Sequence, residues 1–96
     1  METLQRHPAE KDLGQQNAHM LNSIAAAERC VRRLVNDGFT VHTIEMRDRQ
    51  PVIWIAPDAR CANFEGVVRL ARTTLGTRFT VMTTTIDGCY VQWIGN

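Results

Sequence analysis

The sequence predicts an α+β domain in which two helices pack on one face of a four-stranded antiparallel sheet, in the order αββαββ. Three observations lead to this fold class. An uninterrupted apolar run, Val52–Ala56, stands between Pro51 and Pro57, as in an inner strand covered on both faces. Two other stretches repeat apolar residues at steps of three and four, the spacing of a helix face. Finally, Asp87-Gly88 is a preferred two-residue hairpin turn.

The first helix is expected from near Ala18 or Asn22 to Val35, and Asn36-Asp37-Gly38 supplies its stop signal. The residues before it have few large apolar side chains, so we expect a flexible N-terminal arm over 1–16 and a single domain over 17–96. The apolar stripe of this helix consists of Ile24, Ala27, Val31, Leu34 and Val35.

A strand over 39–46, a polar turn and the inner strand over 51–56 are expected to form a hairpin. The second helix is predicted between Asp58 and Leu75, with Asp58 as its N-cap or with Asn63 as an alternative cap one turn later, and with Gly76 just past its end. Its apolar stripe consists of Cys61, Phe64, Val68, Ala71 and Leu75.

The chain is expected to end in a second hairpin, with strands over 78–86 and 89–94. A two-residue turn pairs Ile86 with Cys89, Thr84 with Val91 and Met82 with Trp93, which predicts one core face. The other face is polar enough to meet water or a partner, and it carries Thr83, Thr85, Tyr90 and Gln92.

The sheet order can be predicted by comparison with a common topology. Moving the last strand to the front of αββαββ gives βαββαβ, the ferredoxin-like order. A circularly permuted ferredoxin-like sandwich therefore fits the sequence, and it would place strands 51–56 and 89–94 in the middle of the sheet.

Composition limits the classes of partner. The 96 residues have a formal net charge of +1, so no global field favours nucleic acid or a membrane surface. Ten of the eleven basic residues are arginine, the better residue for forked contacts to carboxylate or phosphate. No secretory signal or membrane span is evident, and the odd number of cysteines suits reduced thiols, so we expect a cytoplasmic protein without membrane partners.

No catalytic, cofactor or metal motif stands out in the sequence. No nucleophile has a recognisable base, and the glycines are isolated turn or helix glycines, not a phosphate loop. A zinc site would have to use Cys30, Cys61, Cys89 and His42, which lack the short spacing of such sites. We therefore expect a non-enzymatic protein with no cofactor.

Arginine clustering gives the candidate partner-binding surface. If the two predicted helices are neighbours, their arginines form a basic layer that can contact phosphates or an acidic protein; solvated helix faces are the structural alternative. An open sheet face with an aromatic residue could stack bases or contact a protein. The candidate residues are Arg29, Arg32, Arg33, Arg69, Arg72, Arg78 and Tyr90.

The stretches Asp37–Val41, Arg49–Ile55 and Arg60-Cys61 resemble small accessory proteins of bacteriophages and prophages. The resemblance implies a protein that binds and blocks a host system, such as a nuclease, a recombination complex or a CRISPR effector. The first hypothesis is accordingly an inhibitor that binds a host protein or protein–nucleic acid complex. The alternative is a small RNA- or DNA-binding domain, and a homodimer is compatible with both.

Overall fold

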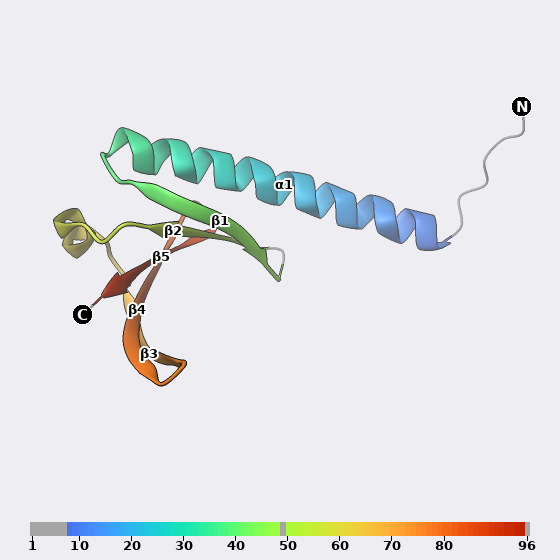
Figure 1. The fold of residues 1–96 in the computed structure, drawn as a ribbon. Coiled ribbons are helices and arrows are strands. Elements are labelled where there is room, and N and C mark those ends of the chain that lie inside the picture. The colour runs from blue at the N-terminus through green and yellow to red at the C-terminus, as the bar shows by residue number, and fades with distance from the viewer. Residues whose placement is uncertain (1–7, 49, 96) are drawn as a thin grey trace, which may run out of the picture.

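The computed structural model describes residues 8–48 and 50–95 as one helix packed on a five-stranded sheet (Figure 1). In chain order the elements are α1 (Pro8–Asn36), β1 (Val41–Arg47), β2 (Gln50–Ile55), the short 3-10 helix η1 (Ala59–Asn63), β3 (Val68–Thr74), β4 (Thr77–Ile86) and β5 (Cys89–Gly95).

The sheet is mixed, and its strands lie in the order β1-β2-β5-β4-β3. β2 and β5 run parallel, and the other three neighbouring pairs are antiparallel. The C-terminal half of α1 covers one face of β1, β2 and β5, while its N-terminal half extends past the sheet (Figure 1). Within residues 8–48 and 50–95 no helix lies on the opposite face of the sheet, and we call it the helix-free face.

The predicted fold class is wrong, and so is the permuted ferredoxin-like order. The structure has one helix and a mixed five-stranded sheet where the sequence predicted two helices and four antiparallel strands. The difference lies in residues 58–75, which form η1 and β3 instead of a second helix. Asp58 does cap a helix, since its carboxylate accepts a hydrogen bond from the Arg60 N–H at 2.8 Å, but that helix is only η1.

Backbone conformation explains why the second helix does not form. Gly66 has φ +66°, a left-handed conformation that interrupts a helix. Beyond it, β3 pairs along its whole length with β4. Leu75 and Gly76, predicted to end a helix, have φ +52° and +79° and form a two-residue hairpin turn. The spacing of three and four was therefore fortuitous.

Both predicted hairpins are confirmed. β1 pairs with β2, and β4 pairs with β5 across the turn Asp87-Gly88. The predicted pairs of Ile86 with Cys89, Thr84 with Val91 and Met82 with Trp93 are all present. The two strands that carry tryptophan, β2 and β5, do lie inside the sheet.

The helix is longer than predicted at its N-terminal end. The helix starts at Pro8, so residues 8–16 of the predicted arm form the first turns of α1. The rest of the predicted arm, residues 1–7, lies outside the described residues. Its end agrees with the prediction, because Asn36 is its last residue and Gly38 follows with φ +95°. Among the described residues, no helix combines the length and the apolar character that a membrane crossing requires.

The main core lies between α1 and the sheet. Leu34 of α1, Ile53 of β2 and Val91 of β5 are almost fully buried there. An aromatic row closes the end near η1: the rings of Phe39 and Phe64 stack at 5.2 Å between centroids, and those of Phe64 and Trp93 lie 5.5 Å apart.

Three free thiols belong to this core, namely Cys30, Cys61 and Cys89. Burial, together with the neighbouring Cys89 and Asp87, raises the pKa of Cys30 from its ordinary value of 9.0 to about 12. Burial also raises the pKa values of Cys61 and Cys89. At neutral pH these thiols are therefore protonated, and they act as small apolar side chains.

Replacing Ile53 by alanine should lower the free energy of unfolding by about 2–5 kcal/mol, because the side chain is fully buried and its loss leaves a cavity. The matched control is Ile44→Ala in the same hairpin, since Ile44 is 48% exposed and should lose about 1 kcal/mol or less. Urea unfolding curves measure both values. Equal losses in the two variants would contradict the assigned core.

The Cys30 thiol should make stability fall at alkaline pH. The unfolded chain loses this proton near pH 9, whereas the folded protein keeps it until about pH 12, so the stabilisation is complete below pH 9 and decreases between these values. Urea unfolding at a series of pH values in that window measures the slope. Cys30→Ala should show a smaller slope than the wild type, and an unchanged slope would refute the assignment.

Candidate functional site

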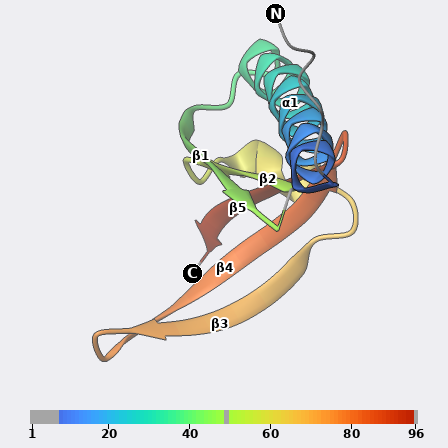
Figure 2. The same cartoon turned by 90° about the vertical axis from the view of Figure 1, so that its right-hand side faces the viewer.

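The β3–β4 hairpin is the part of the sheet that α1 does not cover. It projects away from α1 as a long arm that ends at the turn Leu75-Gly76 (Figure 2). β3 is an edge strand, all seven of its residues are exposed, and it pairs only with β4. One edge of β3 thus presents backbone N–H and C=O groups to solvent, which is a template for pairing with another strand.

The hairpin is cationic on both faces. It has no acidic residue between Glu65 and Asp87, and its three arginines form no ion pair within the described part of the chain. Strand alternation and register place Arg69 and Arg78 on one face and Arg72 on the helix-free face.

The hairpin tip carries an unusual leucine. Leu75 is 100% exposed and has φ +52°, a left-handed conformation that is rare for a bulky residue. Asparagine or glycine fits such a turn position better. Packing within the described protein does not account for a leucine there.

The predicted helix arginines lie in a different environment. Arg32 forms an ion pair with Glu28 at 2.8 Å, and Arg33 forms one with Asp87 at 3.3 Å, all on exposed side chains. Arg29 is also exposed on α1. Because the second helix is absent, the helix and hairpin arginines do not form the single basic layer that neighbouring helices would have produced.

A cleft of about 240 Å³ lies on the helix-free face, and we call it the helix-free cleft. Two of its residues come from opposite edges of the sheet, Arg47 from β1 and Arg72 from β3, so the sheet curls enough to bring its edges to a common site. Its lining residues are Arg47, Trp54, Arg72, Phe79, Val81 and Gln92.

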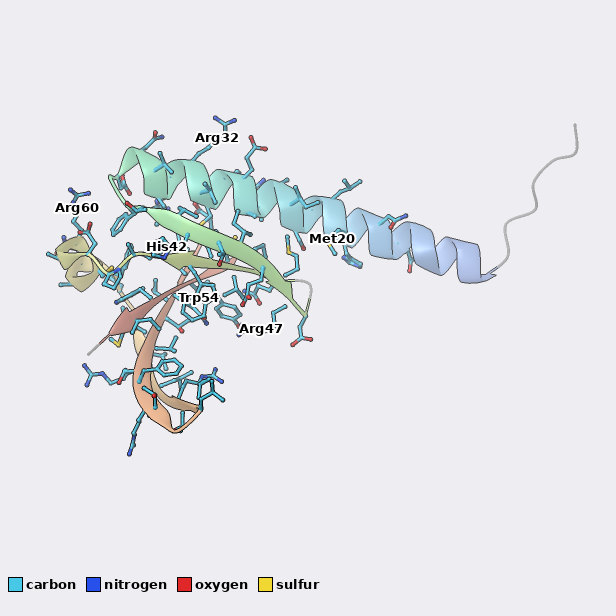
Figure 3. All side chains as sticks on the ribbon, in the orientation of Figure 1. Met20, Arg32, His42, Arg47, Trp54 and Arg60 are labelled. Atoms are coloured by element: carbon cyan, nitrogen blue, oxygen red, sulfur yellow. The ribbon has the colours of Figure 1, made fainter. Side chains whose placement is uncertain are left out.

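One carboxylate organises the β1–β2 side of this cleft. The Oε1 atom of Glu45 accepts hydrogen bonds from Arg47 Nη2 at 2.6 Å and from Trp54 Nε1 at 3.2 Å. Arg47 and Trp54 lie on the side of the hairpin away from α1 (Figure 3). Glu45 therefore fixes the orientation of both the indole and the guanidinium.

Gln92 lies on the inner strand β5, paired with Trp54 on one side and Thr83 on the other. Its side chain is only 6% exposed and lines the cleft, yet its amide forms no hydrogen bond in the described structure. The neighbouring Thr83 Oγ1 is buried and also has no hydrogen-bond partner there. A buried, unpaired polar atom such as Thr83 Oγ1 is rare because its desolvation is uncompensated, whereas the amide atoms of Gln92 keep contact with solvent.

The predicted polar face is thus only partly open. Thr85 and Tyr90 are exposed as expected, and Tyr90 lies on the same face as Gln92, two residues earlier on β5. Gln92 itself is buried, on an inner strand between its paired neighbours Trp54 and Thr83.

An exposed apolar groove lies between α1 and β1 on the other face. Its lining includes Ile24, Val31, Ile44 and Met46, and its volume is about 590 Å³. Met20 and Leu21 continue the exposed apolar surface along α1.

The cysteines do not form a metal site. His42 is exposed, whereas Cys30, Cys61 and Cys89 are buried. Among the described residues, no three histidine, cysteine or acidic side chains are grouped so that they could hold a metal ion.

Sequence reasoning did not identify Glu45, Arg47 or Phe79 as members of a site, and it placed Gln92 on the polar face that could meet a partner without naming it as a candidate residue. Gln92 and Phe79 could have been noticed as residues that share a face under strand alternation. The approach of Arg47 to Arg72 has no local signal, since it depends on the curvature of the whole sheet.

Comparison with known proteins supports the resemblance to phage accessory proteins by assigning the chain to a family. Residues 13–94 match the model of the Kil protein family. No curated protein and no solved structure matches the chain. Kil proteins are phage-encoded, in agreement with the resemblance noted from the sequence, although the match does not identify a host target. Because it spans nearly the entire sequence, the chain belongs to the Kil protein family.

Proposed function

We propose that this protein acts by binding and not by catalysis, and that it inhibits a host protein complex by docking its β3–β4 hairpin. Membership of a phage-encoded family supports a host partner. The resemblance to phage accessory proteins favours a nucleic-acid-handling target, such as a nuclease, a recombination complex or a CRISPR effector. The observation that carries the proposal is the fully exposed Leu75 at the tip of a cationic hairpin.

Leu75 supports a binding role because its position is unfavourable for the isolated protein. A left-handed backbone conformation costs a leucine about 1–2 kcal/mol, and full exposure gives its side chain no contact in return. Outliers of this kind cluster at functional sites. An apolar anchor that enters a pocket of a partner would account for the residue.

The free edge of β3 supports a specific mode of docking. An extended segment of the partner can add a sixth strand beside β3, so that backbone hydrogen bonds provide affinity. The side chains of Arg69 and Arg78 flank this edge without ion-pair partners among the described residues. Acidic side chains on the incoming strand would complement them, so the partner segment is expected to be acidic.

Replacing Leu75 by asparagine should separate stability from function. The variant should raise the free energy of unfolding by about 1 kcal/mol, because asparagine tolerates the left-handed conformation of the turn. It should also weaken partner binding at least about tenfold through loss of the apolar anchor. Urea unfolding and binding to the purified partner measure the two effects. A variant that is more stable and binds unchanged would refute the role of Leu75.

The charge requirement can be tested with Arg69→Glu/Arg78→Glu. A photo-reactive amino acid at position 73, on the exposed edge strand, identifies the partner in host lysate and the segment that it contacts. Capture should survive nuclease treatment, map to an acidic segment and be lost in the double variant. The control is Arg29→Gln/Arg32→Gln on α1, which should retain capture.

The alternative of direct RNA or DNA binding makes different predictions in the same experiment. Capture would then disappear with nuclease, and affinity would fall steeply with salt because arginine contacts to phosphate release counterions. Either that result or crosslinks confined to basic segments would overturn the strand-addition proposal.

A further inference from the structure

We propose that the helix-free cleft binds a nucleotide, with its base held by Gln92 and the aromatic residues and its phosphate held by Arg47 and Arg72. The site lies on the helix-free face, whereas the proposed host contact uses the β3 edge, Arg69 and Arg78. The inference therefore goes beyond the proposed function and can fail independently of it.

The amide of Gln92, which lines the cleft without a hydrogen bond, is the observation that points to a ligand. Gln92 is held on an inner strand, the residue is only 6% exposed, and its amide has no hydrogen-bond partner in the described structure, so its donor and acceptor are available to a ligand. An amide has a donor group and an acceptor group side by side in one plane. The hydrogen-bonding edge of a nucleobase presents the complementary arrangement, and side chains read unpaired bases along this edge.

The aromatic residues supply the second requirement for a base. Trp54 of β2 and Phe79 of β4 line the same cleft as Gln92. Aromatic side chains stack on bases of any sequence, because every base presents a π face. The hydrogen bond from Trp54 Nε1 to Glu45 holds the indole in place before a ligand arrives, which lowers the entropic cost of binding.

The arginines supply the third requirement, a site for phosphate. Arg72 forms no ion pair within the described residues, and Arg47 uses one guanidinium nitrogen for Glu45. An arginine has five N–H donors in a planar fork, so Arg47 retains donors for a second acceptor. With the carboxylate of Glu45 counted, the two arginines leave this region with a net positive charge that suits one phosphate group.

The size of the cleft limits the ligand to a single nucleotide. Its volume of about 240 Å³ is below the roughly 300–1,000 Å³ typical of pockets that enclose drug-sized molecules. The base can enter while the sugar and phosphate remain near the rim. Both a free mononucleotide and one unpaired nucleotide of a single strand have this chemistry.

Isothermal titration calorimetry with the purified full chain tests the proposal. The probes are adenosine, guanosine, cytidine and uridine monophosphates, together with single-stranded oligonucleotides of two lengths for each base. At least one mononucleotide should bind saturably with a dissociation constant of about 1 mM or lower. A constant of 1 mM corresponds to a binding free energy of about −4 kcal/mol. Tighter binding of every oligonucleotide, rising with its length, would assign the site to a strand, and equal affinity would assign it to a free nucleotide.

Three variants tie binding to the cleft. Gln92→Met keeps the length of the side chain and removes its polar atoms, so affinity should fall at least about tenfold while stability is kept or raised. Arg72→Gln should lower affinity by a similar factor. Arg69→Gln is the matched control, because Arg69 lies on the same strand and faces the other side of the sheet, and it should bind like the wild type.

Several results would overturn the proposal. They are no heat of binding from any probe, full affinity in Gln92→Met, or equal losses in Arg69→Gln and Arg72→Gln, which would indicate diffuse phosphate attraction. Leu75→Asn separates the two proposals, since it should retain nucleotide binding even if it abolishes capture of the host partner.

Discussion

Burial of β2 on both faces is the constraint on which the rest of the structure depends. Ile53 and Ile55 point toward α1, Val52 points toward the helix-free face, and all three are almost fully buried. A helix covers the first face, but the described chain has no second helix for the other. On that face, side chains from all five strands line the helix-free cleft, which spans the sheet from edge strand β1 to edge strand β3. The face of β2 that α1 leaves uncovered is thus the face on which the cleft forms.

Features with local causes could be predicted from the sequence. The end of α1 follows from the glycine after it, and the register of β4 and β5 follows from the Asp87-Gly88 turn together with strand alternation. The inner position of β2 follows from its uninterrupted apolar run. The arginines of the hairpin were candidates on different elements, Arg69 and Arg72 on the predicted second helix and Arg78 just after it, whereas the structure places them on β3 and β4.

Residues 58–75 show where such reasoning fails. Val68, Ala71 and Leu75 are spaced like a helix face, while Val68 and Leu70 alternate like a strand, and the sequence satisfies both patterns. Pairing with β4 decides between them, and that pairing is a tertiary effect. The cleft is harder still to predict from the sequence, because Arg47 and Arg72 come from opposite edges of the sheet. Their place in one cleft depends on the parallel pairing of β2 with β5, which has no local signal.

The exposed edge of β3 raises the question of why copies of the protein do not join there. A flat edge with exposed Val68 and Leu70 would otherwise be an aggregation site. Antiparallel pairing of two β3 strands would bring four arginines, Arg69 and Arg72 from each copy, close together without acidic residues between them. Like charges disfavour that pairing, whereas an acidic strand is attracted by the same side chains. The arginines of β3 therefore discriminate between partners: they oppose self-association and leave the edge available for a chain of opposite charge.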